Sequence, residues 1–310
     1  MSKSYLRNVI GEYMSVLGEK NRKVLVINAD LAATCRNKAF KEKFPEREFS
    51  VGIAEQNMVS FAVGLSLEGY IPFVFSMAPF LTMRAAEQVR TDVAYGSKNV
   101  KLISVYSGVS GGISGATHWG LEDIGIVTSM PGITVIEAGD KVEAQKILEL
   151  ATEYDGPVYI RCSVEPCDDI YDESEEFSFG GSKTVFEGND GAVLCAGVTV
   201  SYALEAAKAV EEEKGKRFRV VDLYSIKPID KKAVIDAAKT GKVIVAHDHN
   251  IYGGLGSMVS KVICEEGIAT DLVNIGVPDR FDAMAHAPYL YEKYGYDVKG
   301  IKEAILKMIK

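Results

Sequence analysis

The segment AEQNMVSFAVGLSLEGYIPFVF, residues 54–75, decides the fold class of this chain. Apolar residues recur at helical spacing from Ala54 to Leu67, and Gly69 is a residue type that commonly ends a helix. The run Ile71–Phe75 is rich in aromatic and β-branched residues and is typical of a buried strand. A helix followed within a few residues by a strand is the repeating unit of an α/β protein with a mainly parallel sheet.

The same alternation continues in both directions and predicts two domains. We expect strands at Val24–Asn28, Ile71–Phe75, Lys101–Tyr106, Ile133–Glu137, Val158–Arg161, Ala192–Ala196, Phe218–Leu223, Val243–Ala246 and Leu272–Ile275. We expect helices at Ala54–Leu67, Leu81–Ala94, Lys141–Ala151, Tyr202–Glu213, Lys231–Ala238 and Leu255–Glu266. Residues 167–190 interrupt the pattern with Asp, Glu, Ser and Gly and are predicted to be an acidic linker. The predicted domains are therefore residues 1–166 and 191–310, each a mainly parallel sheet flanked by helices.

Composition limits the possible functions. The chain has 310 residues and a formal net charge of −8, so it lacks the basic footprint that nucleic-acid binding needs. Its longest apolar stretches fall far short of the roughly 20 residues that span a bilayer, and its start lacks an apolar signal region. The five cysteines form no C-x-x-C pair. We expect a cytoplasmic protein with free thiols, no membrane contact and no nucleic-acid partner.

Four motifs are candidates for chemistry. Glu55, in GIAEQNM, falls in the first turn of a predicted helix, where the helix dipole favours a carboxylate. The glycine-rich segment 107–120, which contains His118, follows a predicted strand, and α/β proteins bind ligands at such strand ends. Arg161 ends another strand, where an arginine can grip phosphate. His247 and His249 flank Asp248, but without a third ligand nearby no metal site is predicted.

Five segments in order resemble the transketolase family over nearly the whole chain. They are GIAEQNMVSFAVG, MRAAEQVR, GATHWGLED, GPVYIR, and HNIYGGLGS with VPDRF. The resemblance implies that residues 1–166 are a pyrimidine-binding domain and residues 191–310 the family's C-terminal domain. It also implies thiamine diphosphate as cofactor and transfer of a two-carbon ketol unit between sugar phosphates, because that cofactor supplies the carbanion chemistry.

The resemblance assigns roles to individual residues. Glu55 would bond a pyrimidine ring nitrogen of the cofactor and promote the imino form of its exocyclic amine. His118 would make polar contact with the cofactor's amino group and the donor's hydroxyls, and would transfer protons. Leu81 occupies the position where many members stack an aromatic ring, and Phe80 lies beside it, so both are assigned to the cofactor. Arg161 is assigned to a substrate phosphate.

Departures from the family pattern carry two further expectations. Gly108 and Ser114 stand where the family often has His and Asp, which favours a sugar other than xylulose 5-phosphate. No GDG…N motif for diphosphate and Mg²⁺ is present, so a separate N-terminal subunit should bind the diphosphate and the Mg²⁺. The expected assembly is a heterotetramer with that subunit or a homodimer. The alternatives are the β subunit of a 2-oxo-acid dehydrogenase first component, a deoxyxylulose-phosphate synthase-like half, and a non-catalytic regulatory subunit.

Overall fold

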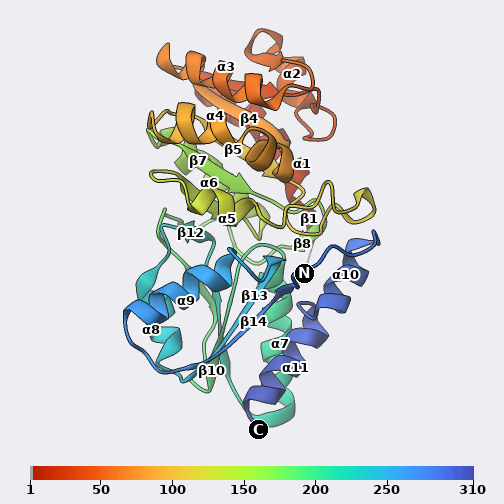
Figure 1. Cartoon of the computed structure of the whole chain (residues 1–310), viewed down its shortest axis with the longest axis vertical. Helices are drawn as coiled ribbons and strands as arrows, with labels where there is room; N and C mark the ends of the chain where they lie inside the picture. The colour runs from red at the N-terminus through yellow and green to blue at the C-terminus, as the bar shows by residue number, and fades with distance from the viewer. Residues whose placement is uncertain (1–2) are drawn as a thin grey trace.

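The computed structural model describes residues 3–310 and contains two α/β domains stacked end to end (Figure 1). The N-terminal domain occupies the upper half of the view and the C-terminal domain the lower half. The predicted class is confirmed, because each domain is a mainly parallel sheet with helices on both faces.

The first sheet has the strand order β12-β6-β7-β5-β4-β2-β3. Its strands are parallel except β12, which comes from the C-terminal half of the chain and pairs antiparallel with β6. The strands are β2 (Val24–Asn28), β3 (Glu48–Ser50), β4 (Ile71–Met77), β5 (Lys101–Val105), β6 (Thr134–Glu137), β7 (Val158–Arg161) and β12 (Ser225–Lys227). The central strands β2, β4, β5, β6 and β7 are buried along their whole length, so their sequences are mostly apolar and do not alternate with exposed polar residues.

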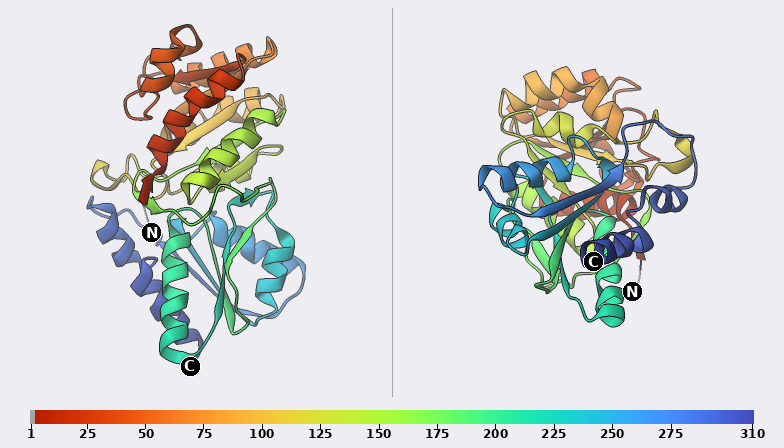
Figure 2. Two further views of the ribbon diagram at one scale, coloured as in Figure 1. Left: turned by 180° about the vertical axis from the view of Figure 1, so that it is seen from behind. Right: turned by 60° about the horizontal axis from the view of Figure 1, so that its bottom comes forward.

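Helices cover both faces of this sheet. On one face α1 (Leu6–Lys20) packs on α2 (Lys38–Lys43) and α6 (Lys141–Glu153), as the view from behind shows (Figure 2). The other face carries α3 (Glu55–Leu67), α5 (Asp123–Thr128) and the segment that links β4 to β5. The 3₁₀ turns are η1 (Pro45–Arg47) and η4 (Gly112–Ser114).

The second sheet has the strand order β14-β13-β10-β11-β9. Its strands are β9 (Lys183–Phe186), β10 (Gly191–Cys195), β11 (Phe218–Asp222), β13 (Lys242–Asn250) and β14 (Asp271–Val277), and only β9 is antiparallel. Around it lie α7 (Thr199–Lys214), α8 (Lys231–Ala238), α9 (Leu255–Glu265), α10 (Ala287–Tyr294) and α11 (Val298–Met308). A small ribbon of β1 (Lys3–Tyr5) and β8 (Pro166–Asp168) joins the first and last parts of the N-terminal half.

Two predicted helix starts are confirmed by their capping bonds. Asp140 accepts hydrogen bonds from the amides of Val142 and Glu143 at 2.6 and 3.2 Å, while the Glu143 carboxylate accepts from the Gly139 amide at 2.6 Å. Asp230 likewise accepts from the Ala233 amide at 3.0 Å. Each acidic side chain satisfies amides that the first helical turn leaves without backbone partners.

Two segments differ from their predicted form. Residues 81–94 are not one regular helix but two π-helical turns, η2 (Phe80–Arg84) and η3 (Val89–Ala94), on either side of the short α4 (Ala86–Gln88). The predicted linker contributes the edge strand β9 to the second sheet, because Lys183–Phe186 pairs with β11. A four-residue edge strand that is only partly buried has too weak a pattern to stand out from an acidic segment.

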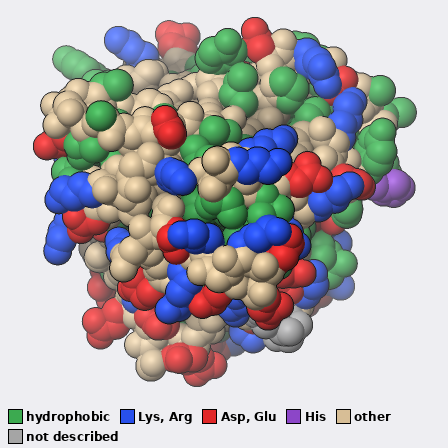
Figure 3. Space-filling view, turned by 90° about the horizontal axis from the view of Figure 1, so that it is seen from below, with side chains coloured by type: hydrophobic (Ala, Val, Ile, Leu, Met, Phe, Trp, Pro, Cys, Tyr) green, Lys and Arg blue, Asp and Glu red, His purple; other side chains and the backbone are tan. Residues whose placement is uncertain are grey.

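The surface shown in Figure 3 is the C-terminal end of the molecule, where acidic and basic side chains alternate around a small apolar patch. Within residues 3–310 we find no helix with the length and apolar character of a membrane span.

Candidate active site

Glu55 is the first residue of α3 and lies buried at the carboxyl edge of the first sheet. Its side chain is only 1% exposed, and its Oε2 accepts a hydrogen bond from Arg84 Nη1 at 2.7 Å. The hydroxyl of Ser76, near the end of β4, is 3.4 Å from the other oxygen, Oε1. Position, burial and an incompletely bonded oxygen all suit a carboxylate that receives a ligand.

Phe80 and Leu81 follow β4 and occupy different environments. Phe80 is half-buried, and the Arg84 guanidinium lies 4.2 Å from the centre of its ring. Leu81 is fully buried in the apolar core between the sheet and α3. Arg84 links the Phe80 ring to Glu55, whereas the Leu81 side chain has no exposed surface, so the structure does not support the cofactor contact that the sequence assigns to Leu81.

His118 reaches the same cluster from the glycine-rich loop after β5. Its ring lies edge-on to Phe80, with the centroids 5.3 Å apart and an interplanar angle of 70°. The Thr117 hydroxyl bonds His118 Nδ1 at 2.9 Å, and Nε2 has no partner among residues 3–310. Three segments distant in sequence thus bring Glu55, Phe80 and His118 together, which joins three of the five predicted site residues.

Arg161 lies apart from this cluster and is fully buried between the two domains. Its guanidinium donates to Asp123 Oδ2 at 2.8 Å and to Glu137 Oε1 at 2.6 Å. It also donates to the backbone oxygens of Gly120 and Asp248, both at 2.8 Å. A guanidinium so surrounded offers no surface to a phosphate, so the predicted substrate role of Arg161 is not supported and its contacts are structural.

The His247–His249 segment of β13 completes this buried network from the C-terminal domain. His247 Nε2 bonds Glu137 Oε2 at 2.7 Å, and Asp248 Oδ1 accepts from the Val109 amide at 2.9 Å and the Tyr296 hydroxyl at 2.7 Å. Through Val109, Asp248 holds the start of the loop that carries His118. The sequence suggested only a metal role for these histidines, and none was predicted; the structure pairs His247 with Glu137, 110 residues away in the sequence.

Burial dominates the ionisation of this network. It raises the pKa of Asp248 to about 6, despite the opposing charge of Arg161, and lowers the pKa of His249 to about 3. Burial alone would also raise the pKa of Glu137, but Arg161 and His247 hold that pKa below its ordinary value. At neutral pH His249 is therefore uncharged, and Glu137 is an anion that faces the Arg161 guanidinium.

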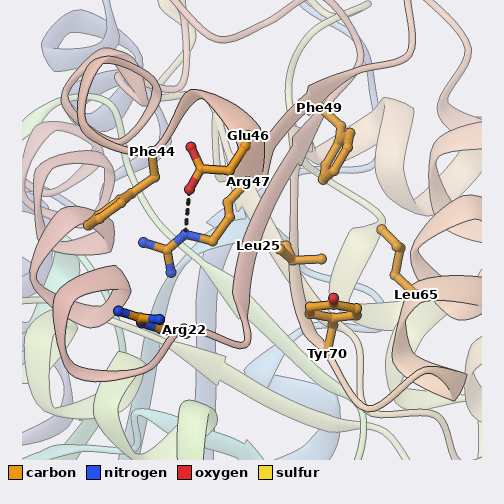
Figure 4. Close-up of a pocket in the computed structure, with 8 residues that line it drawn as sticks. All are labelled: Arg22, Leu25, Phe44, Glu46, Arg47, Phe49, Leu65 and Tyr70. Carbon is orange, nitrogen blue, oxygen red and sulfur yellow. Dashed lines mark ion pairs between the residues drawn. The ribbon is translucent and has the colours of Figure 1, made fainter.

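A hollow lies at the opposite edge of the first sheet, near the amino ends of β2 and β4 (Figure 4). It is lined by Arg22, Leu25, Phe44, Glu46, Arg47, Phe49, Leu65 and Tyr70. The Arg47 guanidinium is stacked 3.8 Å from the centre of the Phe44 ring. Because ligands of α/β proteins bind at carboxyl strand ends, the Glu55 cluster remains the candidate active site. Within residues 3–310, His, Cys, Asp and Glu form no group of three or more that could hold a metal ion.

Comparison with known proteins agrees with this geometry. Residues 2–166 match the transketolase pyrimidine binding domain, and residues 180–301 match the transketolase C-terminal domain. A "putative transketolase C-terminal section" from Methanocaldococcus jannaschii is 36% identical over 98% of this chain and 96% of its own length. A 6-deoxy-6-sulfo-D-fructose transketolase subunit from a Clostridium strain is 34% identical over 98% of this chain and 94% of its own.

A solved structure gives the same result in three dimensions. It is described as a split gene transketolase, inactive beta4 tetramer, and it superposes with a TM-score of 0.87 at 35% identity, over 97% of each chain. The chain described here belongs to the transketolase family. Members of this family depend on thiamine diphosphate, and this chain is a transketolase-type transferase subunit that matches split relatives over nearly their whole length.

Proposed function

We propose that this chain is one subunit of a two-chain transketolase in which Glu55 acts on the pyrimidine ring of thiamine diphosphate. The observation that carries the proposal is the buried Glu55 carboxylate at a carboxyl strand edge, beside the half-exposed Phe80 ring and His118. These residues fit the cofactor, because Oε1 has only a long contact with Ser76 and can take a ring N–H, while Phe80 offers apolar contact.

The work of this chain is to bind the ring and to handle protons. When bound, thiamine diphosphate supplies the carbon nucleophile that adds to a ketose carbonyl. Glu55 holds a proton between its Oε1 and the ring nitrogen, and its burial keeps water from competing for that bond. His118, with Nε2 free to contact a ligand, is placed to exchange protons with substrate hydroxyls.

The remaining parts of the enzyme would come from an N-terminal subunit. The relatives named as a C-terminal section, a subunit and a split gene product support a divided enzyme. We infer that the partner binds the diphosphate and Mg²⁺, and that two copies of each chain form a heterotetramer, since closed symmetry is the usual arrangement. The substrates would be sugar phosphates in the cytoplasm, and the two-carbon ketol unit would pass between them.

Co-expression of this chain with its N-terminal subunit provides the test. We expect Glu55→Gln to lose turnover with ketose phosphates by at least about 100-fold, the lower end of the range for a lost acid–base group. The melting temperature should stay near that of wild type. Glu87→Gln, at an exposed glutamate on α4, is the matched control and should keep full activity. Full turnover in Glu55→Gln, or reaction with pyruvate in place of ketose phosphates, contradicts the proposal.

Cofactor affinity gives an independent measurement. By calorimetry, the pair of subunits should bind thiamine diphosphate and Mg²⁺ far more tightly than this chain alone. Equally tight binding by the isolated chain would refute the division of the cofactor site between two subunits.

A further inference from the structure

Arg84 is the closest polar neighbour of Glu55, and neither the family resemblance nor the proposed function gives it a role. Its Nη1 lies 2.7 Å from Glu55 Oε2, while its guanidinium covers the Phe80 ring at 4.2 Å. The Glu55 side chain is 1% exposed, whereas that of Arg84 is 44% exposed. Arg84 therefore connects a buried carboxylate with the open side of the site.

The backbone fixes Arg84 in this position. Phe80 and Arg84 are the first and last residues of the π-helical turn η2, four residues apart and therefore on the same face. Single π-helical turns occur frequently at functional sites. The cation–π contact with Phe80 orients the guanidinium, so that its Nη1 meets Glu55 at the distance of a charge-assisted hydrogen bond.

The two oxygens of Glu55 are consequently not equivalent. Oε2 accepts a close hydrogen bond from Arg84 at 2.7 Å, whereas Oε1 has only the Ser76 hydroxyl at 3.4 Å, beyond the usual range for an O–H···O bond. A buried carboxylate oxygen without a close donor is energetically unfavourable. Oε1 is thus the oxygen left for a ligand, and Arg84 decides which way it points.

We propose that Arg84 is a positioning residue, which orients Glu55 so that Oε1 can share a proton with the pyrimidine ring. This inference rests on the proposed function. The proton that leaves Oε1 is the one that the ring nitrogen gains, and no other bond changes. The Arg84 guanidinium places a fixed positive charge beside Oε2, and this charge favours the arrangement in which the shared proton lies on the ring nitrogen.

The test compares three variants of the two-subunit holoenzyme loaded with thiamine diphosphate and Mg²⁺. Arg84→Met removes the charge, and Arg84→Lys keeps it. Arg90→Met is the matched control, because Arg90 is exposed on the adjoining turn and forms no ion pair with other residues of the described part. The readouts are kcat, KM for a ketose phosphate, and the circular dichroism of the bound cofactor, which reports the protonation of its pyrimidine ring.

We expect Arg84→Met to lower kcat by roughly 10- to 100-fold, the range that one hydrogen bond to a charged group supplies. KM should change little, and the share of protonated ring should fall at every pH measured. Arg84→Lys should recover most of both signals, and Arg90→Met should match wild type.

Two results would overturn the role of Arg84. One is wild-type kcat and an unchanged ring signal in Arg84→Met. The other is tighter cofactor binding with faster turnover, which would make Arg84 an obstacle that the cofactor displaces. Loss of activity in Glu55→Gln beside wild-type behaviour in Arg84→Met overturns this inference alone. Full activity in Glu55→Gln overturns the proposed function, and this inference with it.

Discussion

Replacement of Arg161 by methionine tests the assignment of this arginine to the domain interface. The substitution removes the cation that faces Asp123 and Glu137 at 2.8 and 2.6 Å and leaves the oxygens of Gly120 and Asp248 without this donor. Breaking a buried ion pair by deleting one partner costs about 3–5 kcal/mol, because the remaining charge stays buried without compensation. We take this range as the expected loss in the free energy of unfolding.

That loss should be visible as a large fall in melting temperature. A chain of this size loses roughly 2–4 °C for each kcal/mol, so the expected shift is on the order of 10 °C. The measurement is scanning calorimetry at neutral pH. Arg217→Met is the matched control, because Arg217 is 52% exposed and its ion pair with Glu211 lies at the surface. Exposed pairs of this kind contribute about 0–1 kcal/mol.

The same variant separates the two roles considered for Arg161. A substrate-phosphate ligand would leave the melting temperature nearly unchanged and raise KM for the sugar phosphate. A shift below about 2 °C together with a raised KM would therefore refute the structural role and restore the one predicted from the sequence.

Three further substitutions test the packing of the loop and the charge of a buried lysine. Gly108→Ala should destabilise the chain by about 2 kcal/mol or more, because its φ of +53° is left-handed and an added Cβ would lie 2.0 Å from the Asp248 carboxyl carbon. Gly52→Ala, with a φ of +74° and no atom within 4 Å, should cost only about 1 kcal/mol by urea unfolding. Burial lowers the pKa of Lys101 to about 7, so above that pH the unfolded chain holds a proton that the folded chain has lost. The stability of wild type relative to Lys101→Met should therefore rise between about pH 7 and 10 in urea titrations, and a difference that stays flat or falls would contradict the lowered pKa.

The main strands could be predicted from sequence because they are buried on both sides. β2 and β7 begin and end at the predicted residues, and β4 and β5 differ at one end only. Continuous apolar runs bounded by polar residues are the signature of such strands. The shorter strands β3, β9 and β12 have three or four residues each, and only their pairing partners define them.

Site residues could be predicted only where each lies in a recognisable sequence motif. Glu55 and His118 lie in motifs that mark them, and the structure places both beside Phe80. Arg161 ends a strand as predicted, but sequence spacing cannot distinguish a cleft from a domain interface. Its partners Asp123, Glu137 and Asp248 lie 38, 24 and 87 residues away, so only the tertiary structure brings them together.

The interface also explains why glycine stands at position 108. Asp248 fills the volume that a side chain on Gly108 would enter, and the Asp248 carboxylate bonds the next amide, that of Val109. Any larger residue at position 108 would require Asp248 to move, and with it the Arg161 contact to the Asp248 backbone. The two positions must therefore change together. It follows that the C-terminal domain, through Asp248, shapes the loop that carries His118.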